Sequence, residues 1–238
     1  MQLILIRHGQ TPSNLLNLLD TAVPGPGLTP LGVQQAAAVP ADLAGQPISA
    51  LYVSNLVRTA QTAEPLAAAL GLTPEIREGL REISAGSLEM KSDTESLTAY
   101  LLTLKAWLTG DLSARMPGAD TGYEVLERFD DVVREAADKH GGGTVAMVSH
   151  GAMIRFWAGY RATNIDWSDH KYFELSNTGI VIVDGAMPAP NGMGPHTPGG
   201  WEISEWRGTP AGGLAGSHSD GPTAEFAASG IVVDNDNG

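Results

Sequence analysis

The chain has 238 residues, of which 42% are hydrophobic, and a formal net charge of −13. This length suits one globular domain with an appended segment. The acidic charge argues against nucleic acid as a partner, because proteins bind it by neutralising phosphates with lysine and arginine. No stretch approaches the roughly 18 apolar residues of a membrane helix, so no membrane partner is expected.

The chain lacks cysteine, which excludes disulfide bonds and thiolate metal sites. Met1 leads directly into an apolar run, without the basic and apolar regions of a secretory signal. Both features favour a cytoplasmic location.

Residues 2–7 predict a buried strand, because four apolar residues precede Arg7-His8-Gly9. A second apolar run over 144–149 ends in the same way, at His150-Gly151. Ligands of open α/β sheets bind beyond the carboxyl ends of the strands. We therefore expect the two histidines to lie at one ligand-binding edge.

The other segments alternate between strand and helix patterns, which is typical of an α/β protein. This alternation predicts a three-layer α/β/α sandwich with a mostly parallel central sheet. Further strands are expected at 51–53, 75–77 and 180–183, and helices at 30–44, 56–70, 94–108, 121–139 and 151–160.

We expect one domain over 1–185, followed by an acidic extension over 186–238. The extension contains 11 glycines and 6 prolines in 53 residues, a composition that favours a mostly flexible segment. Residues 201–206 nevertheless alternate like an edge strand. A strand that docks on this chain or on a partner is therefore the alternative.

Four polar segments could carry chemistry, although each alone has an ordinary structural explanation. Thr11 and Asn14 are common helix-capping residues, and Arg58 could form a surface ion pair. Glu82 lies in a loop, where most carboxylates are solvated, and His150 could simply cap a strand. The repeated strand–His–Gly arrangement argues against a purely structural role for His150.

Taken together, the four segments resemble the motifs of the histidine phosphatase superfamily, also called the phosphoglycerate mutase-like family. They occur in the family's order, over residues 1–184. The segments are Arg7-His8-Gly9-Gln10-Thr11 with Asn14; Ser54-x-Leu56-x-Arg58-x-x-x-Thr62; Leu80-x-Glu82-x-x-x-Gly86-x-x-Glu89; and Ser149-His150-Gly151 with Arg155.

The resemblance implies a phosphoglycerate mutase-like fold and a phosphomonoesterase that acts through phosphohistidine. His8 would be the nucleophile, and Glu82 would protonate the leaving oxygen and then activate water. Arg7, Asn14, Arg58 and His150 would bind the phosphoryl group. No metal or other cofactor is expected, because arginines can neutralise the phosphoryl charge.

The substrate implied is a small phosphorylated metabolite, such as a sugar phosphate or a phosphoglycerate derivative. Mutases of the family usually carry Trp before the first-motif asparagine, where this chain has Ser13, so a phosphatase is favoured over a mutase. A non-catalytic phospho-ligand binder and a homodimer are left open. Residues 87–120 are expected to form an insertion near the site, whose helix mainly packs on the domain.

Overall fold

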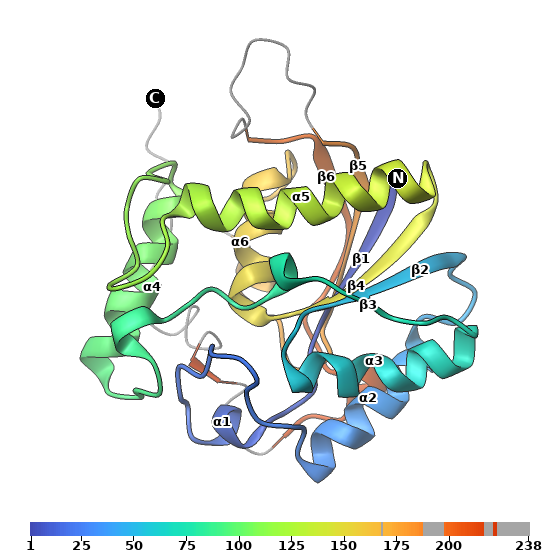
Figure 1. Cartoon of the computed structure of the whole chain (residues 1–238), viewed down its shortest axis with the longest axis horizontal. Helices are drawn as coiled ribbons and strands as arrows, with labels where there is room; N and C mark the ends of the chain where they lie inside the picture. Colours follow the sequence, from blue (N-terminus) through green and yellow to red (C-terminus); the bar gives the residue numbers. More distant parts are fainter. Residues whose placement is uncertain (168, 188–197, 217–220, 223–238) are drawn as a thin grey trace.

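A six-stranded sheet runs through the centre of the computed structural model, which describes residues 1–167, 169–187, 198–216 and 221–222 (Figure 1). The strands lie in the order β3-β2-β4-β1-β5-β6. The first four strands of the chain are mutually parallel, whereas β5 is antiparallel to β1 and to β6. The strands are β1 Gln2–Arg7, β2 Ile48–Val53, β3 Glu75–Ile76, β4 Thr144–Ser149, β5 Ile180–Gly185 and β6 Trp201–Arg207.

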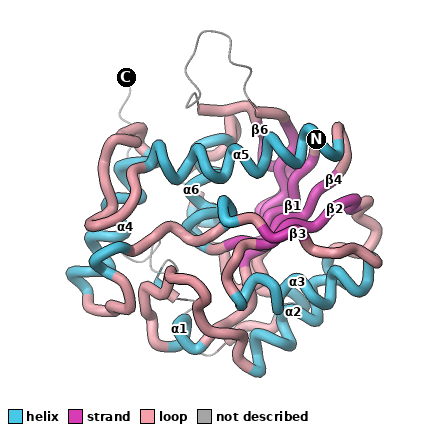
Figure 2. The backbone as a smooth tube through the Cα atoms, viewed as in Figure 1, coloured by secondary structure: helices cyan, strands magenta, loops and turns pink. Residues whose placement is uncertain are grey.

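Helices cover both faces of the sheet (Figure 2). One face packs against α2 (Pro30–Asp42) and α3 (Val57–Leu70). The other face packs against α4 (Thr94–Leu108), α5 (Gly122–His140) and α6 (Gly151–Arg161). The short helical turns are α1 Pro12–Leu15, η1 Glu78–Leu80, η2 Gly86–Leu88, η3 His170–Phe173 and η4 Ala211–Gly213.

Strand β1 shows how the sheet separates two apolar cores. Leu3 and Leu5 belong to the core beneath α4, α5 and α6, whereas Ile4 and Ile6 belong to the core beneath α2 and α3. All four side chains are fully buried. Successive side chains of a strand point to opposite faces, so a continuous apolar run fits a strand covered on both sides. The predicted three-layer α/β/α sandwich is confirmed.

Two helix starts follow from local chemistry. The Thr29 side chain accepts a hydrogen bond from the Gly32 amide, and Pro30 occupies the first turn of α2. Thr121 and Glu124 form a reciprocal capping box at the start of α5. Strand β2 begins three residues before its predicted start, because the polar Ser49 interrupts the apolar pattern there. Its pairing with β4 is irregular between Ile48 and Ala50.

Part of the predicted extension belongs to the folded body. Residues 201–207 form β6 on the sheet edge, as the alternating pattern predicted. Trp201 is 1% exposed and Ala211 is fully buried, so the interpretation as a flexible segment is wrong for this stretch. Residues 188–197, 217–220 and 223–238 of the predicted extension lie outside the described residues.

Among the helices that the structure describes, none has the length and apolar character required to cross a membrane.

Candidate active site

Strands β1 and β4 bring His8 and His150 together. The strands are parallel neighbours, and Arg7 is paired with Ser149, so each histidine follows its strand at the same level of the sheet edge. The His8 amide donates a hydrogen bond to the Ser149 carbonyl over 3.0 Å. The two ring centroids are 5.2 Å apart, and both side chains are buried.

The ring of His8 is held in one tautomer. Nδ1 lies 2.8 Å from the Gly9 carbonyl oxygen. A carbonyl only accepts, so Nδ1 carries the proton and Nε2 keeps its lone pair. Burial, and then the charges of Arg58 and Arg7, hold the pKa of His8 well below its usual value. The neutral imidazole therefore has a nucleophilic nitrogen.

His150 forms a unit with residues at the end of β2 and in α3. Arg58 Nε donates to His150 Nδ1 over 3.3 Å, and His150 Nε2 lies 2.8 Å from Ser54 Oγ. Because Nδ1 accepts, the neutral ring carries its proton on Nε2 and donates to Ser54. Burial, with the charge of Arg58, holds the pKa of His150 well below its usual value.

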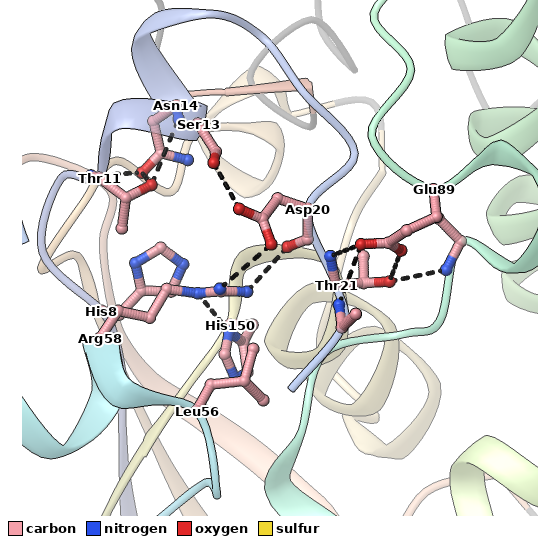
Figure 3. Close-up of polar contacts among 12 residues, drawn as sticks. His8, Thr11, Ser13, Asn14, Asp20, Thr21, Leu56, Arg58, Glu89 and His150 are labelled. Atoms are coloured by element: carbon pink, nitrogen blue, oxygen red, sulfur yellow. Dashed lines mark hydrogen bonds and ion pairs between the residues drawn. The ribbon is translucent and has the colours of Figure 1, made fainter. Parts of the chain in front are cut away.

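Arg58 extends from the first turn of α3 towards the loop that contains Asp20 (Figure 3). Its Nη2 donates to the Asp20 carbonyl over 2.9 Å, and its Nη1 lies 3.8 Å from the Asp20 carboxylate. Among the described residues, Nη1 has no hydrogen-bond partner although it is buried. This edge of the guanidinium group is suited to an anionic ligand.

Arg7 and Asn14 lie beside His8. Arg7 Nη1 donates to the Leu175 carbonyl over 2.6 Å. Asn14 Oδ1 accepts from the Thr11 amide at 2.9 Å and from Asn177 Nδ2 at 3.2 Å. The oxygen of Asn14 is thus engaged by the protein, which leaves the NH₂ group as the end that can contact a ligand.

Glu82 lies at the N-terminus of α6. One carboxylate oxygen accepts from the amides of Ile83 at 2.9 Å and Met153 at 3.0 Å, and the other accepts from the Ala152 amide at 3.3 Å. The exposed amides at a helix N-terminus offer hydrogen-bond donors to a carboxyl group in this position. Glu82 is therefore fixed in orientation.

A single pocket collects five of the six predicted site residues. His150 is not in its wall, but it contacts both His8 and Arg58. Tyr100 of α4 also lines the pocket and donates to the Ile83 carbonyl over 3.0 Å, while its neighbours in α4 pack in the core. The lining residues are Arg7, His8, Thr11, Ser13, Asn14, Leu18, Leu19, Asp20, Thr21, Arg58, Glu82, Tyr100 and Pro222.

The sequence did not indicate several residues that shape this pocket. Asp20 and Pro222 line it, and Asn177 donates to the His8 carbonyl over 3.1 Å. Glu89 is the last residue of the third motif and had no predicted role. It accepts from the Thr21 amide at 2.8 Å and so fixes the loop that contains Asp20. These residues lie in loops without periodicity, so no local pattern marks them.

The arrangement can bind an anion and transfer a group from it. A neutral imidazole, two buried guanidinium groups and an oriented carboxylate share one pocket. Arginine matches phosphate oxygens bidentately, and a transferring phosphoryl group spreads negative charge over its oxygens. In the described part of the chain, His, Asp and Glu side chains form no cluster of three or more that could hold a metal ion.

Comparison with known proteins agrees with this geometry. The sequence model described as histidine phosphatase superfamily (branch 1) matches residues 3–189. The PE-PGRS family protein PE_PGRS11 of Mycobacterium tuberculosis is 36% identical over 224 residues, which cover 87% of this chain and 36% of that protein. A probable phosphoglycerate mutase GpmB of Yersinia pestis is 30% identical over 154 residues, which cover 65% of this chain and 71% of that protein.

A solved structure shares the fold. Phosphoserine phosphatase from Entamoeba histolytica, in complex with 3-phosphoglyceric acid, superposes with a TM-score of 0.65 at 26% identity and covers 90% of this chain and 99% of that chain. The chain thus spans only about a third of the PE-PGRS relative, but nearly all of this phosphatase. By its motifs, its fold and the match over most of its length, the chain belongs to branch 1 of the histidine phosphatase superfamily.

Proposed function

We propose that the protein is a metal-independent phosphomonoesterase that hydrolyses a small phosphorylated metabolite through a phosphohistidine at His8. The observation that carries the proposal is the tautomer of His8. Its Nδ1 is bonded to the Gly9 carbonyl, so Nε2 is free to attack, and its pocket also contains Arg7 and Arg58. A nucleophile in a site with two fixed cations suits phosphoryl transfer.

The reaction has two balanced steps. In the first, His8 Nε2 bonds to phosphorus, the ester P–O bond breaks, and protonated Glu82 gives its proton to the leaving alcohol. In the second, Glu82 takes a proton from water as the water attacks phosphorus. The P–N bond then breaks, inorganic phosphate leaves, and neutral His8 and protonated Glu82 are restored.

Arg7, Arg58 and Asn14 bind the phosphoryl oxygens during both steps, and His150, whose ring nitrogens contact Arg58 and Ser54, acts on the phosphoryl group through Arg58. Hydrogen bonds to charged groups contribute about 1.5–3 kcal/mol each, so several of them offset the repulsion from an acidic protein surface. His150 already accepts from Arg58 through Nδ1, so it also fixes the guanidinium that contacts the phosphate.

Hydrolysis is favoured over mutase chemistry. The phosphoserine phosphatase relative supports a phosphatase, whereas the GpmB relatives bear a mutase name. A mutase must exclude water from its phosphohistidine, and Ser13 stands where the mutases usually carry tryptophan. A small substrate, a cytoplasmic location and the absence of nucleic-acid or membrane partners fit the charge of −13 and the lack of cysteine.

The test is turnover of p-nitrophenyl phosphate in the presence of EDTA, from pH 4 to pH 8. We expect the wild-type protein to release inorganic phosphate, and His8→Ala to lose at least about 10³-fold in rate. His140→Ala is the matched control, because His140 lies at the end of α5 and contacts Tyr52 instead of the pocket.

Three outcomes would contradict the proposal in different ways. Activity that survives His8→Ala would remove His8 as the nucleophile. Wild-type protein that binds phosphate without turnover at any pH would be a non-catalytic binder. Interconversion of phosphoglycerates without net release of phosphate would make the protein a mutase.

A further inference from the structure

Asp20 places an acidic group in a pocket otherwise suited to an anion. Its side chain is 9% exposed, and its carboxylate lies 3.8 Å from Arg58 Nη1. The Ser13 hydroxyl donates to the same carboxylate. All three residues line the pocket that contains His8. A negative charge here weakens phosphate binding, so its presence calls for a compensating role.

The position of Asp20 is fixed by contacts on both sides (Figure 3). Its carbonyl accepts from Arg58 Nη2 at 2.9 Å. The next two residues are held by Glu89, which accepts from the Thr21 amide at 2.8 Å and from the Ala22 amide at 3.0 Å. The carboxylate is therefore a built part of the pocket wall.

In the described part of the chain, the pocket lining offers no cation for a second anionic group. Its lining contains two cations, Arg7 and Arg58, and both are assigned to the phosphoryl group. None of the residues outside the described part of the chain is lysine or arginine, so no such residue completes the pocket. A carboxylate on the substrate would meet the Asp20 carboxylate with no further cation in the described lining to neutralise it, and like charges at close range repel.

We propose that Asp20 determines specificity, so that the enzyme prefers phosphomonoesters whose leaving alcohol carries an ammonium group, then a hydroxyl group, over those that carry a carboxylate. This inference rests on the proposed function. The Asp20 carboxylate accepts a hydrogen bond from the donor on the leaving alcohol while Arg7 and Arg58 hold the phosphoryl oxygens. The bond to an ammonium group is charge-assisted and therefore the strongest of the three.

Three probes of similar size test the inference: 2-aminoethyl phosphate, 2-hydroxyethyl phosphate and phosphoglycolate. We expect kcat/KM to fall in that order in the wild-type enzyme. Asp20→Asn removes the charge but keeps an oxygen for the Ser13 hydroxyl and the backbone contact to Arg58. We expect it to lower the ratio of aminoethyl phosphate to phosphoglycolate at least about tenfold.

Asp42→Asn is the matched control. Asp42 lies at the end of α2, and its carboxylate is 3.8 Å from Arg207 Nη1, the same separation as in the Asp20–Arg58 pair. This variant should keep the wild-type ratio. An Asp20→Asn variant that loses activity equally on all three probes would overturn the inference, because Asp20 would then only position Arg58. A wild-type enzyme that prefers phosphoglycolate would also overturn it.

Binding separates this inference from the proposed function. In the His8→Ala protein, which is not expected to turn over, isothermal titration gives Kd for each probe with and without Asp20→Asn. The role of Asp20 is supported if Kd rises from 2-aminoethyl phosphate to 2-hydroxyethyl phosphate to phosphoglycolate in His8→Ala and if this order is lost when Asp20→Asn is added. This holds even if the wild-type protein hydrolyses nothing. Equal Kd values for the three probes contradict it whatever the result with p-nitrophenyl phosphate.

Discussion

His8 and His150 link the chemistry of the site to the stability of the fold. Burial, together with the charge of Arg58, holds the pKa of each imidazole well below 6.5. Below pH 6.5 these histidines bind protons in the unfolded chain but not in the folded chain, so their contribution to stability is greatest above this pH and falls as the solution becomes more acidic. The loss continues until the pH reaches the lowered pKa values of the folded protein.

This linkage predicts a difference between the wild-type protein and His8→Asn. Each neutral buried histidine contributes a slope of up to about 1.4 kcal/mol per pH unit below pH 6.5. The variant should lose one such contribution. Urea unfolding at pH 7.5, 6.0 and 5.5 measures the slopes, and equal slopes in the two proteins would show that His8 binds protons equally in the folded and unfolded states.

Glu82 is predicted to matter more for the second chemical step than for the first when the leaving group is p-nitrophenolate. This anion departs without a proton, so Glu82→Gln should still form the phosphoenzyme. Hydrolysis lacks its base and should slow by about 10²–10⁴-fold. Stopped-flow absorbance should then show a burst of about one equivalent per site, followed by slow turnover.

Glu78→Gln is the control for Glu82, since Glu78 is exposed and pairs with Arg81 near the same loop. It should turn over p-nitrophenyl phosphate at the wild-type rate, and its burst should be no larger than that of the wild-type enzyme. A Glu82→Gln enzyme with the wild-type steady-state rate would assign the proton transfers to another group.

The sequence indicated site residues where they follow regular strands or stand in family motifs. His8 and His150 end two apolar runs, and parallel pairing then places them together. Asp20 lies in an aperiodic loop rich in proline and glycine, and its role depends on the distant partners Arg58 and Glu89. Contacts of this kind are set by tertiary structure, so no local pattern could reveal them.

At the level of elements, helices α5 and α6 are joined by a buried ion pair. Asp130 and Arg161 are both fully buried and form a salt bridge. Asp130 also accepts from Trp157 Nε1 at 2.8 Å. Removing one partner leaves an uncompensated buried charge, which is typically destabilising by about 3–5 kcal/mol.

We therefore expect Asp130→Ala to lower the free energy of unfolding by about 3–5 kcal/mol. Its neighbour Asp131 is exposed and pairs with Arg134 one turn away, so Asp131→Ala should change stability by less than about 1 kcal/mol. Chemical denaturation of both variants measures the difference. Equal, small effects of the two substitutions would contradict this prediction and would mean that the buried ion pair contributes little to stability.

The strands and long helices were predictable because each combines a regular apolar pattern with a start or stop signal. Strand β6 was harder, since its surroundings have the composition of a flexible segment. What holds it is tertiary: Trp201 packs against Trp157 of α6 with ring centroids 5.5 Å apart, and β6 pairs along β5. Amino-acid composition reflects the local preference for flexible or regular structure, so it cannot predict such long-range packing.

At the scale of the whole molecule, the C-terminal part of the chain returns to the site formed by its beginning. Gly221 is buried, and a Cβ atom on it would lie 2.7 Å from Asn14 Nδ2 and 3.5 Å from Arg7 Nη2. Pro222 is part of the pocket lining. These two residues therefore restrict the space beside the groups assigned to phosphate binding.

Deletion of residues 217–238 should widen the pocket while the fold is kept, because β6 and η4 remain in place against β5 and α2. We expect kcat/KM for the bulky 2-naphthyl phosphate to rise at least about tenfold relative to that for 2-hydroxyethyl phosphate, since a tight wall discriminates between substrates mainly by size. Pro222→Gly should move the ratio in the same direction by a smaller factor. Circular dichroism and the urea midpoint of the truncated protein report whether the body is intact. An intact truncated enzyme with the full-length ratio would mean that Gly221 and Pro222 do not limit the entry of substrate.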